Sequence, residues 1–359
     1  MLFIFFLLSI VLSVCLTLLV RRWALRFGLV DFPDGKRKLH HKPIPLAGGI
    51  ACYTAFALVV VVVLWIGVGK EIAVKKIIGM LMAGAVLIIG GILDDKYNLK
   101  PWQQCLAPIG AALMVIASGI GLDSITHPLY DRTSALGHIS LEVWKLQVIQ
   151  WRGVPYFLSL PADFITFLWL MGMMYTTKFL DGLDGLVSGV SIIGVVFILA
   201  VSMALRQTMS PVLALIFLGA MVGFWLFNKS PASIFLGEGG SVWAGFMLAV
   251  LAIISDAKLT VTALVMGLPI VDVAWVIVNR IIRRKSPFRG DRTHLHFRLL
   301  DSGMSHKRVV GIIYLSAFSL GAAGLFFKNI PVLLLLGASV FVMALIIFLV
   351  WQYQPAQRN

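Results

Sequence analysis

Charged residues are scarce in this sequence. They make up 13% of its 359 residues, whereas 60% of the residues are hydrophobic. Because soluble globular domains have roughly a quarter of their residues charged, this composition excludes an ordinary soluble protein. Long apolar runs recur along the whole chain, and they predict a single integral membrane domain over residues 1–359.

Cysteine is also rare, and internal repeats are lacking. Cys15, Cys52 and Cys105 lie in or beside apolar runs without C-x-x-C spacing, which excludes a cysteine-based metal site and a disulfide framework. The first apolar run has no basic residues before it and no small-residue cleavage site, so we expect a retained first span. The lack of repeats argues against a transporter built from inverted repeats.

About eleven apolar runs approach the roughly 20 residues that an α-helix needs to cross a bilayer. We therefore expect an all-α polytopic membrane protein. Its N-terminus should lie outside and its C-terminus inside, since most of the 30 Lys and Arg residues then fall in cytoplasmic segments. The runs are 2–20, 47–68, 76–93, 102–120, 160–177, 186–205, 209–227, 240–255, 259–279, 309–327 and 331–350.

Two longer polar segments separate these runs. Residues 121–159 form the expected outer loop, where HISLEVWKLQVI alternates apolar and polar residues and predicts a short strand or half of a hairpin. Residues 280–308 form the expected cytoplasmic loop, which is basic. The net charge of +14 suits anionic headgroups and phosphorylated substrates, and no nucleic-acid partner is expected for a membrane protein.

The few acidic residues gather where predicted spans begin or end. Asp94 and Asp95 follow the third run, Asp181 and Asp184 follow the fifth in KFLDGLDG, and Glu238 precedes the eighth. Each acid alone has a structural explanation, because helix ends tolerate charge. Three acidic clusters beside glycines on one face instead predict a site for Mg²⁺ or Mn²⁺. The i, i+3 spacing of Asp181 and Asp184 predicts one face of a helical turn.

The loop 280–308 adds cationic side chains. Arg289, Arg292, His294 and His296 could reach phosphates, and the two histidines would share a face if the segment were extended. A zinc site is not expected, because further ligands are missing nearby. A solvated basic loop is the alternative explanation for the arginines.

One carboxylate, Asp272, falls inside a predicted span. A functional role is the default for such a residue, and a transporter or lipid scrambler would use it. An ion pair with a Lys or Arg near the cytoplasmic end is the other explanation, and we expect a structural role.

Five ordered blocks link these residues to a known family. The chain resembles the polyprenyl-phosphate N-acetylhexosamine-1-phosphate transferases, the family that contains WecA and MraY, and its last block is closer to the WecA type. This resemblance implies transfer of a sugar 1-phosphate, most of all GlcNAc 1-phosphate, from a UDP-N-acetylhexosamine to undecaprenyl phosphate, with release of UMP and with Mg²⁺ or Mn²⁺. The blocks are RKLHHKPIPLAGGIA, LDDKYN, FLDGLDGL, FNKSPASIFLGEGGS and SPFRGDRTHLHFRLLDSG.

The resemblance also implies a location and a set of roles. It places the active site on the cytoplasmic side of the inner membrane, and it allows a homodimer. The implied catalytic residues are Asp94, Asp95, Asp181 and Asp184; the metal ligands are Glu238 and Asp94; the substrate-binding residues are Lys42, Lys178, Asn228, Arg289, Arg292, His294 and His296.

Four positions depart from the family pattern. Glu238 stands where an aspartate is usual, Lys178 and Tyr175 replace asparagines, and Asn98 replaces the third acid of a D-D-x-x-D motif. We expect the Lys178 ammonium to face the substrate diphosphate or the carboxylates. Two alternatives stay open: another UDP-N-acetylsugar, such as the MurNAc-pentapeptide form, or a homologue that binds its ligands without turnover.

Overall fold

The computed structural model describes residues 2–33, 42–67, 74–126, 138–141, 143–151, 154–255, 259–284, 286, 292–327 and 330–352. Most of these residues are helical, and each predicted apolar run falls on one helix or on two consecutive helices. The helices are α1 (Leu2–Arg26), α2 (Gly48–Trp65), α3 (Val74–Tyr97), α4 (Pro101–Gln104), α5 (Leu106–Ala117), α6 (Ala162–Leu180), α7 (Leu186–Ala204), α8 (Met209–Asn228), α9 (Gly237–Ile254), α10 (Leu259–Val265), α11 (Gly267–Ile282), α12 (Leu295–Asp301), α13 (His306–Phe326) and α14 (Val332–Gln352).

Seven helices within the described residues are long and apolar enough to cross a membrane: α1, α2, α3, α7, α8, α9 and α13. The consecutive helices α10 and α11 meet at a 71° bend, and they make an eighth span if they are counted as one. The chain is therefore a multi-pass membrane protein by its helices, while the full count of eleven and the N-out orientation stay predictions.

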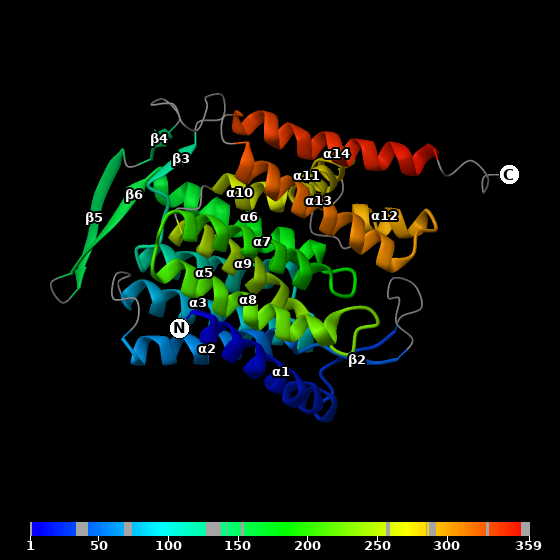
Figure 1. Cartoon of the computed structure of the whole chain (residues 1–359), viewed down its shortest axis with the longest axis horizontal. Coiled ribbons are helices and arrows are strands. Elements are labelled where there is room, and N and C mark those ends of the chain that lie inside the picture. The colour runs from blue at the N-terminus through cyan, green and yellow to red at the C-terminus, as the bar shows by residue number, and fades with distance from the viewer. Residues whose placement is uncertain are drawn as a thin grey trace.

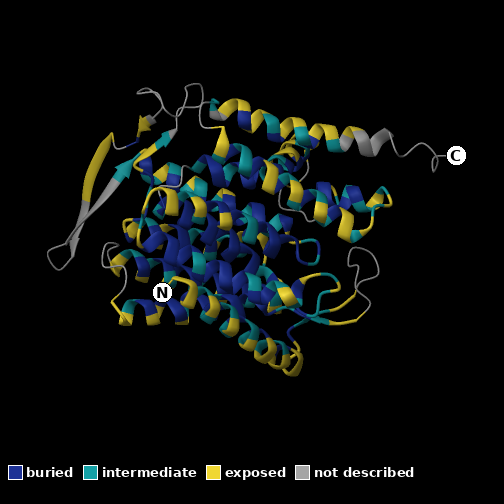
Figure 2. Cartoon of the chain, viewed as in Figure 1, coloured by how far each residue is buried: buried dark blue, intermediate teal, exposed yellow. Residues whose placement is uncertain are grey.

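Helix α9 is the central helix of the bundle. It packs against α2, α3, α6, α7, α8 and α10, and nearly all of its residues are buried, as the dark core of Figure 2 shows. Large apolar side chains such as Phe3, Trp65 and Phe341 are exposed on the outer helices, where lipid would cover them. The first turn of α9 therefore lies at the centre of one end of the bundle.

The strands form three separate two-stranded antiparallel sheets. The predicted strand within 121–159 is confirmed, but it is divided between β4 and β5, and β5 is half of a hairpin with β6. Figure 1 shows this hairpin projecting from the end of the bundle opposite to α12. The strands are β1 (Val30–Asp31), β2 (Ile44–Pro45), β3 (Ser124–Thr126), β4 (His138–Ser140), β5 (Trp144–Trp151) and β6 (Val154–Leu160).

The end of the bundle that carries α12 also holds β2 and the turn between α6 and α7 (Figure 1). The ends of α3 and α8 and the start of α9 join them there, as the lining of a shared cavity shows. Segments that are distant in sequence thus meet at one end, as the three acidic clusters predicted. The H-x-H pair lies at the start of the short helix α12, with His294 at its N-cap, so the segment is not the extended one in which the two histidines would share a face.

Candidate active site

A cavity of about 1350 Å³ opens at this end of the bundle. Seven of the predicted site residues line it: Lys42, Asp94, Asp95, Asp181, Asp184, Asn228 and Glu238. Five carboxylates from α3, the α6–α7 turn and α9 therefore share one space. The structure confirms that the three acidic clusters come together.

Glu238 and Asp95 meet through the backbone of α9. Glu238 lies in the first turn of that helix, and its N–H donates to both Asp95 carboxylate oxygens at 3.3 and 3.1 Å. The N-terminal amides of a helix favour a negative charge. Gly237, just before Glu238, has φ +77°, and a Cβ there would lie 2.8 Å from Asp95 Oδ2. Only glycine fits this approach of α9 to α3.

Asp94 is buried at the end of α3 and shapes the turn that follows it. Its Oδ1 accepts hydrogen bonds from the Leu99 N–H at 2.9 Å and from Gln104 Nε2 at 3.0 Å. Asn98, inside this turn, has φ +50°, a left-handed conformation that asparagine tolerates better than most residues. The asparagine at position 98, where the family pattern has an acid, therefore has a local conformational reason.

Asp181 and Asp184 lie in turns between α6 and α7 rather than on one helical turn, which corrects the expectation from their spacing. Asp184 Oδ2 accepts the Ala232 N–H at 3.0 Å, and the Asp184 N–H donates to His306 Nε2 at 3.1 Å. Ser241 of α9 lies close enough to Asp181 to lower the pKa of its carboxyl, while the Ser241 hydroxyl donates to the Glu238 carbonyl at 3.0 Å. The turn is thus fixed by contacts to three other parts of the chain.

Protein atoms around Asp181 raise the pKa of its carboxyl to about 7, by desolvation first and then by the negative charge of Glu238. The side chain nevertheless remains exposed to the cavity. A carboxyl whose folded pKa is raised stabilises the fold at low pH, and this contribution is lost as pH rises toward 7.

We therefore expect the unfolding temperature of the metal-free protein in detergent to fall between pH 5 and pH 8. In Asp181→Asn this fall should be smaller, because the asparagine does not titrate. Thermal unfolding with EDTA at both pH values measures the difference, and equal falls for the two proteins would refute it.

Lys178 faces the carboxylates, as predicted. Its ammonium forms an ion pair with Glu238 Oε1 and donates to Gln104 Oε1 at 2.9 Å. The contact joins the last turn of α6 to the first turn of α9. Whether Lys178 also binds substrate stays a prediction.

Asn228 is buried at the end of α8. Its Oδ1 accepts the Ser188 hydroxyl at 2.8 Å, and its Nδ2 donates to the Ile234 carbonyl at 3.1 Å. The amide therefore connects α7 to the loop before α9 while it lines the cavity.

The histidines of the H-x-H pair are buried behind the α6–α7 turn, outside the cavity lining. His294 Nδ1 lies 2.8 Å from Asp272 Oδ2, while Asp272 Oδ1 accepts the Leu295 N–H at 2.8 Å. His296 packs against Gly182 of the turn. The partner of the intramembrane acid is thus His294, which corrects the expected Lys or Arg.

The structure describes one of the two predicted arginines. Arg292 bonds Asp301 at 2.6 Å, and its guanidinium lies 4.9 Å from the centre of the Phe297 ring. Phe297 itself lines the cavity, so Arg292 stands one side chain away from it. Arg289 lies outside the described residues.

Sequence reasoning missed several polar residues that line the cavity, among them Gln104 and His306. Gln104 stands in PWQQCLA directly after LDDKYN, and His306 opens α13 after the H-x-H loop. A polar side chain beside a predicted span end was the available signal for both.

The oxygen donors suit a hard divalent cation. Within the described part of the chain, however, no group of three or more His, Cys, Asp or Glu side chains is arranged to hold a metal ion by itself. Mg²⁺ commonly uses one or two protein carboxylates together with substrate phosphates and water. The residues therefore fit a cation that is shared with a substrate, and they do not fit an all-protein cage.

Comparison with known proteins agrees with this geometry. Residues 77–256, half of the chain, match the glycosyl transferase family 4 profile. The chain belongs to glycosyl transferase family 4. The matched region contains Asp94, Asp95, Asp181, Asp184 and Glu238, so the family 4 profile covers every carboxylate identified above in the cavity.

Named relatives extend the family 4 match to most of the chain. A probable undecaprenyl-phosphate N-acetylglucosaminyl 1-phosphate transferase of Bacillus subtilis is 29% identical over 330 residues, covering 90% of this chain and 84% of the relative. A decaprenyl-phosphate N-acetylglucosaminephosphotransferase of Mycolicibacterium smegmatis is 28% identical over 366 residues, covering 92% and 84%. An undecaprenyl-phosphate alpha-N-acetylglucosaminyl 1-phosphate transferase of Escherichia coli is 26% identical over 314 residues, covering 85% and 78%.

Proposed function

We propose that this chain is a phosphoglycosyltransferase that transfers N-acetylglucosamine 1-phosphate from UDP-N-acetylglucosamine to a polyprenyl phosphate and releases UMP. The observation that carries the proposal is the group of five carboxylates around one cavity at the end of a membrane bundle. Family 4 membership and the activities named for the relatives support it. The cavity exceeds the usual size of a small-molecule pocket, which suits two substrates at once.

The chemistry asks the protein chiefly to position two anions and to balance their charge. Mg²⁺ or Mn²⁺ would supply positive charge at the diphosphate, held by cavity carboxylates and by the substrate itself. Asp95 and Asp94 would orient the lipid phosphate. Because a phosphate monoester is already largely ionised at pH 7, orientation suits these residues better than proton removal.

Cationic side chains would hold the substrate phosphates from the rim. Lys42 is exposed and lines the cavity beside β2, and Arg21 lines it from the end of α1. Asp184 fixes the α6–α7 turn and Asn228 fixes the loop before α9, and both segments line the cavity. The excess of Lys and Arg in the segments at this end supports a cytoplasmic position for the cavity, at the inner membrane.

A panel of UDP-N-acetylsugars tests the proposal. Purified protein in detergent with undecaprenyl phosphate and either Mg²⁺ or Mn²⁺ should release UMP with UDP-N-acetylglucosamine. Release with a different UDP-N-acetylsugar would assign another donor, and no release with any donor under either metal would refute the enzyme.

The ion pair between Lys178 and Glu238 favours a second candidate, a homologue that binds nucleotide sugar or lipid phosphate without turnover. Such a protein would bind UDP-N-acetylglucosamine in a titration and yet release no UMP. Recovery of UMP release after Lys178→Asn combined with Glu238→Asp would support it.

A further inference from the structure

Lys178 places a positive charge at the edge of the group of carboxylates. Its side chain is 14% exposed and that of its partner Glu238 is 26% exposed, so the ion pair is largely shielded from water. The Lys178 ammonium also lies 5.7 Å from the centre of the Tyr175 ring. A shielded ion pair interacts more strongly than one on a surface, because less solvent screens its charges.

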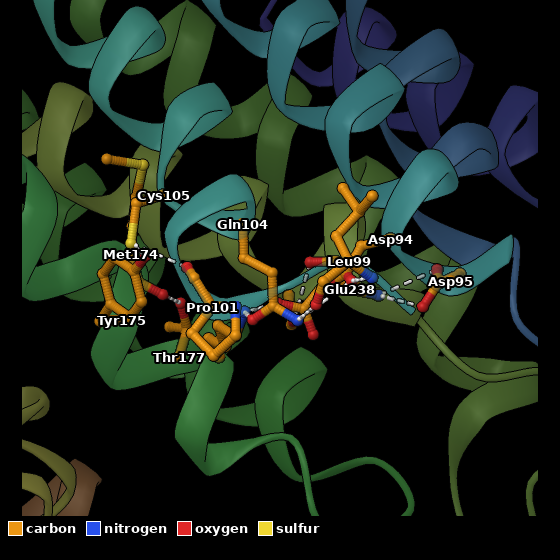
Figure 3. A network of polar contacts seen from close by, with 12 residues as sticks. Asp94, Asp95, Leu99, Pro101, Gln104, Cys105, Met174, Tyr175, Thr177 and Glu238 are labelled. Carbon is orange, nitrogen blue, oxygen red and sulfur yellow. Dashed lines mark hydrogen bonds and ion pairs between the residues drawn. The ribbon is translucent and has the colours of Figure 1, made fainter. Parts of the chain in front are cut away.

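Gln104 connects this pair to a second carboxylate. Its Oε1 accepts from Lys178 at 2.9 Å, while its Nε2 donates to Asp94 Oδ1 at 3.0 Å and to the Leu99 carbonyl at 3.1 Å. Figure 3 shows Gln104 between Asp94 and the Tyr175–Cys105 pair, in which the tyrosine hydroxyl lies 3.0 Å from the sulfur. The amide oxygen and the amide nitrogen of Gln104 thus both have hydrogen-bond partners. Gln104 is held in place by them, and it holds Lys178 in turn.

The contact depends on the length of both side chains. Lys178 lies in the last turn of α6 and Glu238 in the first turn of α9, and two long side chains span the distance between these helix ends. Aspartate at 238 is one methylene shorter, and asparagine at 178 has no charge. Two of the departures from the family pattern therefore meet in a single contact.

A carboxylate with a fixed cationic partner is a weaker ligand for a metal ion. An approaching cation must displace the ammonium or accept the repulsion between two positive charges at short range. Glu238 lines the same cavity as Asp94, Asp95, Asp181 and Asp184, so these four aspartates remain as oxygen donors when Lys178 holds the glutamate.

We infer that Lys178 and Glu238 act as one unit, in which the Lys178 ammonium is a built-in counter-ion that withholds the Glu238 carboxylate from the divalent cation and so weakens cation binding. Lys178 is a positioning residue in this scheme, because it acts through Glu238. The inference deepens the proposed function, on which its biological meaning rests, but cation binding can be measured without any turnover.

A double-mutant cycle on Mn²⁺ binding tests the inference. Wild type, Lys178→Asn, Glu238→Gln and the double variant are titrated with Mn²⁺ in detergent without substrates, and free Mn²⁺ is read by electron paramagnetic resonance. Lys178→Asn should tighten Mn²⁺ binding by about tenfold or more, since a unit charge is removed at short range and a carboxylate is released. In the Glu238→Gln background the same substitution should change binding by less than about threefold, because no carboxylate is left to release.

Matched variants separate this effect from a general change of charge or fold. Lys96→Asn removes one positive charge from the end of α3 that carries Asp94 and Asp95. Lys96 is exposed and its ammonium lies over the Tyr97 ring, so this substitution should leave Mn²⁺ binding unchanged. Lys178→Arg keeps the charge and should bind Mn²⁺ as wild type does. If Lys178→Asn does not fold, as judged by size exclusion and thermal unfolding, Lys178→Gln replaces it in the cycle.

Two results would overturn the inference. If Lys178→Asn tightened Mn²⁺ binding equally in the wild-type and Glu238→Gln backgrounds, the ammonium would act by simple repulsion. If it did not tighten Mn²⁺ binding in the wild-type background, Glu238 would not be withheld from the cation. Neither measurement requires turnover of any UDP-sugar, so failure of the proposed function is recognised separately.

Discussion

Asp95→Asn is expected to reduce UMP release by about 10²-fold or more, because losing a group that orients a reacting phosphate costs on this order. The asparagine amide oxygen can still accept the Glu238 N–H, which the Asp95 carboxylate accepts at 3.3 and 3.1 Å. The start of α9 should therefore stay in place while the negative charge in the cavity is lost. Initial rates with saturating donor and lipid, together with the unfolding temperature, measure both effects.

Asp123→Asn is the matched control for this prediction. Asp123 is exposed and lies just before β3, toward the hairpin end of the bundle, so the same chemical change should leave UMP release within about twofold of wild type, as for most surface substitutions. Full activity of Asp95→Asn would remove this carboxylate from the reaction. A large loss of unfolding temperature would instead assign Asp95 to the fold alone.

Asp272→Ala is expected to destabilise the protein by about 2–6 kcal/mol, because two buried hydrogen-bonding partners are left unsatisfied at about 1–3 kcal/mol each. Both carboxylate oxygens of Asp272 are engaged, one with His294 and one with the Leu295 N–H. Removing them leaves the buried start of α12 without acceptors, and His296, which packs on Gly182, should lose its fixed position. UMP release should then fall together with the unfolding temperature.

Asp163→Ala is the control at the other end of the bundle. Asp163 Oδ2 accepts one N–H, that of Ser159, at 2.7 Å in the first turn of α6, so its loss should resemble that of a helix cap, about 1 kcal/mol. If Asp272→Ala and Asp163→Ala were equally stable, the anchoring role of Asp272 would be wrong. A stable Asp272→Ala protein with lost activity would show that Asp272 positions His294 rather than holding the fold.

Helix positions followed from the sequence because they depend on local hydrophobicity. Each predicted apolar run lies on a helix or on two consecutive helices, since a long apolar segment in lipid must satisfy its own backbone hydrogen bonds. Helix ends were less predictable. Glu238, expected before its span, lies inside the first turn of α9, and Asp94 and Asp95, expected after theirs, lie inside α3. The bend between α10 and α11 was not predicted.

The residues that form the site were easier to predict than the contacts between them. The sequence placed five acids at span ends on one face, and the structure gathers them around one cavity. It did not indicate that Asp95 would hold the start of α9, that His294 would pair with Asp272, or that α12 would place the histidines behind the α6–α7 turn. These contacts join residues from 22 to 143 positions apart, and nothing local encodes them.

The sequence by itself determined that this protein is a multi-pass membrane protein with a polar, acidic end and a family 4 pattern of blocks. Hydrophobic runs and charge placement are local properties, and they act before the helices pack. Only the tertiary structure decided which acid faces which partner. Lys178 could have met a substrate or any of several carboxylates, and the packing of α6 on α9 set it against Glu238, because a side chain bonds only to groups that packing brings within its reach.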